Sequence, residues 1–466
     1  MNHYQVAIIG GGPGGYVTAI RLNQYGISTI VFEKDRLGGV CLNWGCIPTK
    51  ALVKVADLYG EIRNSEEFGI HVNDFSIDYE KVFNRKNEVV EKLVSGVEFI
   101  FRKRKMEVMK ETVTEIKKDQ DQFVIHSMEG TEVSAEYVII ATGSVPKPLP
   151  FMPFDGNKIL SSTDILNLRE LPKSLAIIGG GVIGCEFASI FMQMGVKVEI
   201  VEFLPSILTT EDEEIAKRMS MAFKKAGVKI NTGAGVERYE EQPDGIHLFT
   251  SNGKEIIAEK VLVSVGRDLP FKIEMKGLNL DMDRGRILIN DKMETNLPNI
   301  FAIGDITGKL QLAHTASKQG LIAAEILKQR IAGQPETVEP LEYMNIPRCT
   351  FTNPEIASVG FSEKEAVQKY ASIKVGKFPF GANGKAIGLG ATFGFVKTIV
   401  DADSGLLVGM HIIGPQATEL IAQGAILIGS RISNHEAAEI VCAHPTLSEA
   451  VAESIEDSLS LAIHQV

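Results

Sequence analysis

The sequence predicts an α/β protein with two Rossmann-like dinucleotide-binding domains followed by a C-terminal α+β domain. Three observations support this prediction. A chain of 466 residues is too long for one hydrophobic core, since domains usually contain about 100 to 200 residues. A unit of apolar strand, glycine loop, helix and acid-tipped strand occurs twice. The last part of the chain mixes strand and helix patterns without that fingerprint.

The first nucleotide-binding unit lies at the N-terminus. An apolar strand expected from Tyr4 leads into a glycine loop, and a second strand from Ile27 to Phe32 ends at Glu33. Such glycines permit a tight turn, the approach of a pyrophosphate to a helix N-terminus, and close helix packing, while the acid accepts hydrogen bonds from a ribose. The loop glycines are Gly10, Gly12 and Gly15.

The second unit repeats this order in register. Its strand begins at Leu175, its last strand runs from Val196 to Val201, and its acid is Glu202. The third glycine precedes the acid by the same number of residues in both copies, so we expect two bound dinucleotides rather than one functional and one vestigial site. The glycines of this loop are Gly179, Gly181 and Gly184.

Further strand and turn signals set the domain boundaries. The strand from Tyr137 ends at Thr142 and Gly143, a proline-rich linker spans Pro146 to Pro153, and a matching strand ends at Gly266. We therefore expect a first dinucleotide domain at 1–147, a second at 148–271, a segment at 272–342 that completes the first site, and a C-terminal domain at 343–466.

Composition excludes several classes of protein. Hydrophobic residues make up 44% and charged residues 23%, as in ordinary globular proteins. A net charge of -11 argues against nucleic acid or an anionic membrane as partner. The basic run at 102–105 is interpreted as a solvated helix end rather than a binding patch. No apolar run reaches about 18 residues, and no signal peptide precedes the first strand, so we expect a cytoplasmic protein. A chain stripped of an organellar presequence would look the same.

Two cysteines five residues apart, Cys41 and Cys46, follow Glu33 closely. In an ideal helix their Cα atoms would lie roughly 8 to 9 Å apart, beyond the ~7 Å that a disulfide tolerates. We therefore expect an irregular backbone there, supplied by Gly45 and Pro48. Two free thiols could also be small buried hydrophobes. The remaining cysteines have no metal-ligand spacing, so no metal site is expected: Cys185, Cys349 and Cys442.

A dithiol and a nicotinamide cannot exchange electrons directly, because thiol exchange joins sulfurs whereas a nicotinamide exchanges hydride. A flavin does both. The run from Cys41 through Cys46 to Pro48, Thr49 and Lys50 resembles the redox-active disulfide of the flavoprotein pyridine-nucleotide disulfide oxidoreductases. Motifs similar to that family recur from residue 4 to residue 455, most closely those of its dihydrolipoamide-oxidising members. The resemblance implies FAD at the first site and NAD at the second.

The resemblance also implies roles for single residues. Cys46 would be the sulfur next to the flavin and Cys41 the one that exchanges with substrate. Lys50, which can also be read as a surface lysine, would lie near the thiolate and pair with Glu186. Asp305 would hold the flavin's ribityl chain, although it could equally be a helix N-cap. Further backbone contacts to the cofactors are implied at Ala313, beside His314, and at Val236 and Gly266.

Glu202 bears on the choice of nicotinamide. Its carboxylate would accept from a ribose 2′-hydroxyl and repel a 2′-phosphate, and residues 203–206 offer no arginine to hold one. The sequence therefore predicts NAD rather than NADP.

A base is expected near the C-terminus. A thiol with a pKa near 8.5 is only about 3% ionised at pH 7, so forming the reactive thiolate costs roughly 2 kcal/mol. A positioned base removes this cost. His444 is the candidate, with Glu449 to orient its ring; His435, beside Glu436, is a rival from composition alone. The string from His444 to Glu449 resembles the family's catalytic motif. In that family the base reaches the other subunit's disulfide, which implies a homodimer formed by the C-terminal domain.

The expected reaction is oxidation of protein-bound dihydrolipoamide through Cys41, Cys46 and FAD, with hydride passed to NAD. Expected partners are the lipoyl-bearing proteins of 2-oxo acid dehydrogenase or glycine cleavage systems. An NADH-dependent reductase of another small disulfide is the alternative. Mercuric and large thioredoxin reductases carry a C-terminal redox pair that is missing here, glutathione-type reductases usually take NADP, and transhydrogenases lack the cysteine pair. A purely structural flavoprotein would need neither the pair nor the base.

Overall fold

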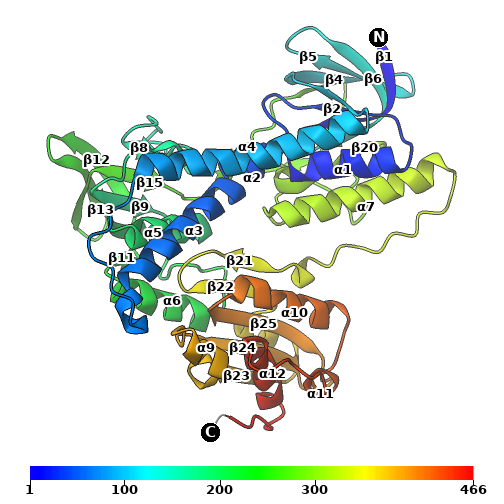
Figure 1. Ribbon diagram of the computed structural model, residues 1–466. Coiled ribbons are helices and arrows are strands. Elements are labelled where there is room, and N and C mark those ends of the chain that lie inside the picture. The colour runs from blue at the N-terminus through cyan, green and yellow to red at the C-terminus, as the bar shows by residue number, and fades with distance from the viewer. Residues whose placement is uncertain (465–466) are drawn as a thin grey trace. The chain divides into compact units, whose positions relative to one another are not determined.

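The computed structural model describes residues 1–464. Its helices and strands are labelled in Figure 1. The chain divides into two compact units. The first consists of Met1–Ala51, Glu80–Lys147 and Arg267–Leu341. The second consists of Leu52–Tyr79, Pro148–Gly266 and Glu342–Val466.

The first unit is built on an eight-stranded sheet. Its central strand, β1 (Asn2–Ile9), pairs in parallel with β2 (Thr29–Phe32) and with β6 (Glu132–Ile140). The first strand thus begins two residues before the predicted Tyr4. Residues 6–9 are buried, as a strand covered on both faces requires. The other strands are β3 (Glu107–Met109), β4 (Val113–Asp119), β5 (Gln122–Ser127), β17 (Glu274–Lys276) and β20 (Ile300–Ala302).

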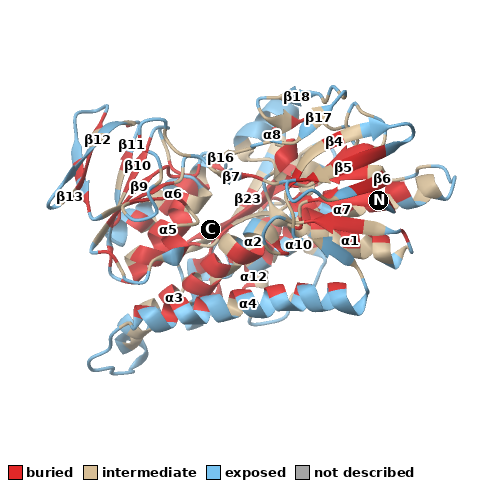
Figure 2. Cartoon of the chain, turned by 90° about the horizontal axis from the view of Figure 1, so that it is seen from above, coloured by how far each residue is buried: buried red, intermediate tan, exposed pale blue. Residues whose placement is uncertain are grey.

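Helices complete the core of this unit. Helix α1 (Pro13–Gln24) lies beside α7 (Ala313–Ile331) (Figure 1). This contact brings together two segments that are 300 residues apart in the sequence. Helix α4 (Tyr79–Lys103) buries a stripe that includes Val90, Val94 and Val97 and exposes its other face (Figure 2). It ends at Lys103, inside the basic run, so that run is the exposed helix end that was predicted.

The second unit contains two further layers. A five-stranded sheet, ordered β11-β10-β9-β15-β8, is parallel throughout. It carries α5 (Val182–Gln193) and α6 (Glu213–Lys225). An antiparallel sheet of three strands adjoins it in sequence. The strands are β8 (Ile159–Leu160), β9 (Ser174–Ile178), β10 (Lys197–Glu202), β11 (Lys229–Thr232), β12 (Val236–Gln242), β13 (Gly245–Thr250), β14 (Glu255–Ala258) and β15 (Lys260–Val263).

The C-terminal part of the second unit is an antiparallel sheet with helices, ordered β21-β22-β25-β24-β23. Its own hydrophobic core includes Phe378, Phe380 and Ile412. The predicted class, two dinucleotide folds and an α+β domain, is confirmed. The elements are β21 (Arg348–Thr350), β22 (Glu355–Gly360), β23 (Ile373–Pro379), β24 (Phe395–Asp401), β25 (Leu407–Gly414), α8 (Glu363–Lys369), α9 (Gly384–Gly388), α10 (Ala417–Gly429), α11 (Asn434–Ala438) and α12 (Ser448–Asp457).

One long helix, α3 (Cys46–Arg63), and several short elements complete the fold. No helix within residues 1–464 is long and apolar enough to cross a membrane. The short elements are α2 (Gly39–Trp44), β7 (Val145–Pro146), β16 (Arg267–Asp268), β18 (Met282–Asp283), β19 (Arg286–Ile287) and five 3₁₀ helices, η1 (Ser65–Phe68), η2 (Ile165–Asn167), η3 (Gly304–Thr307), η4 (Tyr343–Asn345) and η5 (Phe380–Ala382).

Candidate active site

The outer glycines of both loops are required by backbone packing. A Cβ on Gly10 would lie 2.2 Å from the carbonyl oxygen of Ala141, and one on Gly15 would lie 1.8 Å from that of Gly10. In the second copy the corresponding distances are 2.5 Å for Gly179 and 2.0 Å for Gly184. Gly10 and Gly179 also have left-handed φ values of 113° and 106°. The two loops therefore fold in the same way.

The middle glycines have a different role. A Cβ on Gly181 would meet no atom within 4 Å, and the nearest atom to a Cβ on Gly12 would be the Cα of Gly39 at 3.9 Å. Gly12 is the N-cap of α1 and Gly181 is the N-cap of α5. Neither makes a side-chain hydrogen bond to the first turn of its helix. Open space beside unpaired helix N–H groups suits a pyrophosphate. Both loops thus fit a dinucleotide.

Glu33 is held at the first loop by backbone donors. Its Oε2 accepts from the N–H of Gly11 at 2.7 Å and its Oε1 from that of Asp35 at 2.8 Å. Burial raises the pKa of Glu33 against the effect of these two hydrogen bonds. A carboxylate has about four acceptor positions, so two remain for ribose hydroxyls.

Glu202 repeats this arrangement. It accepts from the N–H groups of Gly180 at 2.6 Å and Leu204 at 2.7 Å. The backbone N–H of Ala234 donates to the carbonyl of Glu202 at 3.1 Å, so the chain that enters β12 at Val236 passes this acid. Gly266, the other predicted contact, has φ 119° and open space around its Cα.

The backbone between the two cysteines is broken, as expected. Helix α2 ends at Trp44 and α3 begins at Cys46, with Gly45 between them at φ -145° and ψ -106°. The carbonyl of Gly45 accepts from the N–H and the hydroxyl of Thr49, at 3.1 and 2.6 Å. Pro48, the other predicted contributor, lies in the first turn of α3. In a helix that ran on from Trp44, its missing N–H would leave the Trp44 carbonyl unpaired and its ring would clash there, so it is consistent with the break.

Helix α2 lies directly against the first glycine loop. The N–H of Gly38 donates to the carbonyl of Gly11 at 2.8 Å. A Cβ on Gly39 would lie 2.7 Å from the Cα of Gly12, and Gly39 has φ 53°. Only a glycine allows this approach, which brings the cysteine pair beside the first nucleotide loop.

The two sulfurs interact. A hydrogen bond with Cys46 and burial raise the pKa of the Cys41 thiol, while the ammonium group of Lys50 opposes them. In the reduced pair Cys41 therefore holds its proton more firmly than an ordinary cysteine. Lys50 lies one helical turn after Cys46 in α3.

Asp305 takes part in a small polar network. It lies in η3, whose N-cap is Ile303, so it is not the N-cap that the sequence left open. Its carboxylate accepts a short hydrogen bond from the hydroxyl of Ser144. The guanidinium of Arg267 donates to the same hydroxyl at 2.6 Å and to the Ser144 carbonyl at 2.9 Å.

Sequence reasoning did not assign Ser144 or Arg267 to the site. The available signal was position: Ser144 directly follows the predicted Gly143, which has φ 72°, and Arg267 follows Gly266. Helix α7, whose first residue is the predicted Ala313, is joined to η3 through a 2.7 Å hydrogen bond from the N–H of Gly304 to Gln319.

His444 and Glu449 form the expected pair. His444 Nδ1 lies 2.8 Å from Glu449 Oε1, and the N–H of Thr446 donates to Oε2 at 2.8 Å. These two hydrogen bonds lower the pKa of Glu449. The His444 side chain is 79% exposed, so its second ring nitrogen is accessible to a substrate. At the rival, His435, the neighbouring Glu436 binds the N–H and hydroxyl of Ser433 instead.

A second histidine–carboxylate pair, which sequence reasoning missed, lies on the same helix. Glu453 follows Glu449 by one turn of α12 and accepts from His464 Nδ1 at 2.5 Å. The N–H of Ile463 donates to the same carboxylate at 3.1 Å. Glu453 thus holds the end of the described chain beside the His444–Glu449 pair.

Glu186 lies in α5, is 6% exposed and accepts from the N–H of Phe351 at 3.0 Å. Its pairing with Lys50 stays a prediction.

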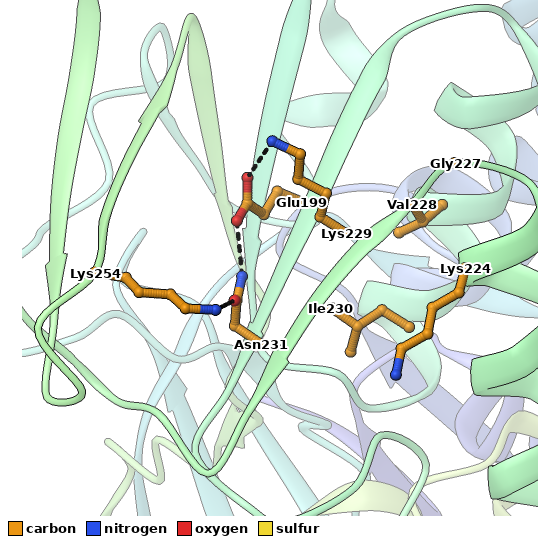
Figure 3. A pocket seen from close by; sticks show the side chains of 8 residues that line it. All are labelled: Glu199, Lys224, Gly227, Val228, Lys229, Ile230, Asn231 and Lys254. Atoms are coloured by element: carbon orange, nitrogen blue, oxygen red, sulfur yellow. Dashed lines mark hydrogen bonds and ion pairs between the residues drawn. The ribbon is translucent and has the colours of Figure 1, made fainter.

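A hollow of about 520 Å³ is lined by residues from the edge of the parallel sheet of the second unit (Figure 3). Asn231 links Glu199 to Lys254 through hydrogen bonds of 2.7 Å each. This hollow is lined by Glu199 of β10 and by 229–231 of β11 but not by the last residue of either strand, whereas nucleotides bind at the carboxyl ends of parallel strands. It is therefore not the nucleotide site.

Comparison with known proteins matches this geometry. Residues 4–320 fit the model of the pyridine nucleotide-disulphide oxidoreductase family, and residues 346–455 fit the dimerisation domain of the same family. The chain belongs to the pyridine nucleotide-disulphide oxidoreductases. Membership of this family confirms the predicted cofactors, FAD and NAD.

Several relatives cover almost the whole chain. A dihydrolipoyl dehydrogenase of Chlamydia pneumoniae is 42% identical over 97% of this chain and 96% of its own length. One from Bacillus subtilis is 40% identical over 99% of both chains. Among solved structures of similar fold, LpdA from Mycobacterium tuberculosis superposes with a TM-score of 0.89 at 25% identity, covering 98% of this chain and 99% of its own. The HOCl-induced flavoprotein disulfide reductase RclA from Escherichia coli gives 0.84 at 27% identity, covering 97% and 99%.

Proposed function

We propose that this oxidoreductase is a dihydrolipoyl dehydrogenase, which oxidises protein-bound dihydrolipoamide to lipoamide and passes hydride to NAD. The observation that carries the proposal is the cysteine pair at the break between α2 and α3, held against the first glycine loop by the contact of Gly39 with Gly12. The relatives at 40 to 42% identity support the choice of substrate.

The two nucleotide loops hold the cofactors in this proposal. The first loop, with Glu33, Asp305 and the backbone at Thr142, Gly143 and Ala313, holds FAD. The second, with Glu202 and the backbone at Val236 and Gly266, holds NAD. The flavin, when bound, supplies a two-electron carrier between sulfur and nicotinamide.

Cys41 and Cys46 perform the exchange with substrate. One substrate thiolate attacks the Cys41 sulfur of the disulfide, a substrate–Cys41 disulfide forms, and Cys46 leaves as a thiolate. The second substrate thiolate then displaces Cys41, so lipoamide is released with two electrons fewer and the cysteine pair holds those electrons.

His444 removes the substrate's thiol protons. Its Nδ1 faces Glu449, which orients the ring and stabilises the imidazolium, so the other ring nitrogen takes the proton. The chain has a dimerisation domain, which supports a homodimer. We assign the base to the disulfide of the other subunit, and Lys50 with Glu186 to a charge pair near the thiolate.

We also infer a cytoplasmic enzyme that serves lipoyl-bearing proteins of 2-oxo acid dehydrogenase or glycine cleavage systems. The four domain segments predicted from the sequence then act as the FAD domain (1–147), the NAD domain (148–271), the segment that completes the FAD site (272–342) and the dimerisation domain (343–466).

An assay with free dihydrolipoamide and NAD tests the proposal. The purified enzyme should form NADH, and a Cys46→Ser variant that retains FAD should not. NADH consumption with another small disulfide, together with no NADH formation from dihydrolipoamide, would favour the alternative reductase.

A further inference from the structure

Phe203 is an exposed aromatic residue beside the acid of the second nucleotide loop. It follows Glu202 at the carboxyl end of β10 and is 76% exposed, the largest exposed fraction of any phenylalanine in residues 1–464. A single exposed apolar side chain needs no explanation by itself. The position of Phe203 is informative, because ligands of an open parallel sheet bind beyond the carboxyl ends of its strands.

The internal repeat shows that the fold does not require an aromatic residue at this position. In the first loop the acid Glu33 is followed by Lys34, although Glu33 and Glu202 accept hydrogen bonds from the backbone of their loops in the same way. The two loops therefore share the acid but differ in the residue after it. Phe203 distinguishes the second loop from the first.

The backbone around Phe203 is held by hydrogen bonds. The N–H of Ala234 donates to the carbonyl of Glu202 at 3.1 Å. The next residue, Gly235, lies against the ring, since a Cβ there would be 3.3 Å from Phe203 Cδ2. Gly235 is itself fixed by Ser251, whose N–H donates to its carbonyl at 2.8 Å and whose hydroxyl accepts from its N–H at 3.0 Å. One edge of the ring thus contacts ordered backbone, while most of the side chain stays exposed.

The chemistry of the nucleotide determines what lies beside Glu202. Its carboxylate is the acceptor expected for the 2′-hydroxyl of the adenosine ribose. In that sugar the carbon that carries the 2′-hydroxyl is bonded to the carbon that carries adenine, so the base must lie close to the acid. Nucleotide bases stack on aromatic side chains, because both present a flat π-face. The residue after Glu202 is therefore suited to contact the base.

We propose that the Phe203 ring stacks on the adenine of NAD and so holds the adenosine half of this cofactor. The inference rests on the proposed function, in which the second loop binds NAD through Glu202. It gives Phe203 a part in binding and none in the exchange between sulfurs or in the transfer of hydride. Because the nicotinamide is at the other end of the dinucleotide, the two halves of NAD can be tested separately.

The test compares Phe203→Ala, Phe203→Trp and Phe151→Ala as purified holoenzymes. Phe151 is a matched control, because it is a phenylalanine of the same unit that is 41% exposed and precedes β8, an edge strand that does not pair with β10. The affinity for ADP-ribose, which lacks the nicotinamide, is measured by isothermal titration calorimetry. The second-order rate constant of flavin reduction is measured with NADH and with reduced nicotinamide mononucleotide, which lacks the adenosine half.

Phe203→Ala should weaken ADP-ribose binding and slow flavin reduction by NADH, each by about 5- to 100-fold, as the loss of a stacking partner does. The rate constant with reduced nicotinamide mononucleotide should not change. Phe203→Trp should keep the affinity for ADP-ribose, which should quench the new indole fluorescence, whereas ribose 5-phosphate should not. The wild type supplies the background from Trp44, the single tryptophan of the chain. Phe151→Ala should match the wild type.

Equal ADP-ribose affinity in Phe203→Ala and the wild type would overturn the inference, as would an equal loss in Phe151→Ala. Equal slowing with both reductants would also overturn it, because the ring would then support the loop rather than bind adenine. A wild-type enzyme whose flavin is not reduced by NADH would instead contradict the proposed function.

Discussion

At the scale of single residues, Glu33 and Glu202 each do two things. Each carboxylate fixes its glycine loop through two backbone N–H groups and keeps acceptor positions for a ribose. The second role was predictable from the spacing of glycines and acid. The first was not, because nothing in a sequence shows which backbone donors a carboxylate reaches after folding.

This double role determines which substitution can test Glu202. Glu202→Ala would leave the N–H groups of Gly180 and Leu204 without their acceptor, so we choose Glu202→Gln, which keeps one oxygen and removes the charge. The ratio of kcat/KM for NAD over NADP should fall by roughly tenfold, since a 2′-phosphate is no longer repelled. Glu33→Gln, the same change at the first loop, should leave that ratio unchanged. A wild-type preference for NADP would contradict the interpretation of the loop.

His464, at the end of the described chain, lies close enough to Glu449 to act on the carboxylate that orients His444. Its hydrogen bond with Glu453 raises the pKa of His464, so the ring stays cationic to a higher pH than an ordinary histidine. That cation also lowers the pKa of Glu449, although it acts less than Thr446 and His444 do. Protonated His464 therefore weakens the negative field that stabilises the imidazolium of His444.

Removing His464 and removing Glu453 should have opposite effects. In His464→Gln the acid limb of kcat/KM for dihydrolipoamide should move to higher pH, because the negative charge of Glu449 beside the base is no longer offset by His464. In Glu453→Gln it should move to lower pH. Both shifts should be a few tenths of a unit, since these groups are exposed and screened. Shifts in the same direction would show that the His464–Glu453 pair acts only by holding residues 463–464 in place.

At the scale of elements, the break between α2 and α3 shows what a local pattern predicts. The spacing of the cysteines required a non-helical backbone, and Gly45 provides it. Pro48 could not lie inside a helix that ran on from Trp44, but it suits the first turn of a new helix. The Ser144–Arg267 hydrogen bonds join residues 123 apart, and no local period encodes such a contact.

The contact between α2 and the first loop can be tested at Gly39. Gly39→Ala adds a methyl group 2.7 Å from the Cα of Gly12 at a positive φ. We expect lower FAD content and a loss of stability well beyond the ~1–2 kcal/mol that a left-handed φ costs a non-glycine residue. Gly26→Ala is the control, because Gly26 has φ 76° but open space around it. Equal losses in the two variants, measured by denaturant unfolding and flavin absorbance, would mean that the close approach is unimportant.

At the scale of the whole molecule, the cysteine pair and the base belong to different compact units of the chain. The pair could be located from a short motif and the base from another, but no sequence pattern shows whether they meet within one chain. The dimerisation domain at 346–455 contains both His444 and Glu449. The proposal that the base works on the disulfide of a second subunit therefore needs a test with two kinds of subunit.

Mixing two inactive variants tests that arrangement. His444→Gln should retain FAD and slow the thiol half-reaction by about 10² to 10⁴, as the loss of a general base does. Cys46→Ser should abolish the same half-reaction by removing the flavin-side sulfur. If the base acts across the dimer, a heterodimer of the two has one site with both an intact disulfide and an intact His444. Activity should then return toward half that of a wild-type dimer, in proportion to the heterodimer that native mass spectrometry detects. Subunit exchange without any recovery would place the base and the disulfide of each site in the same chain.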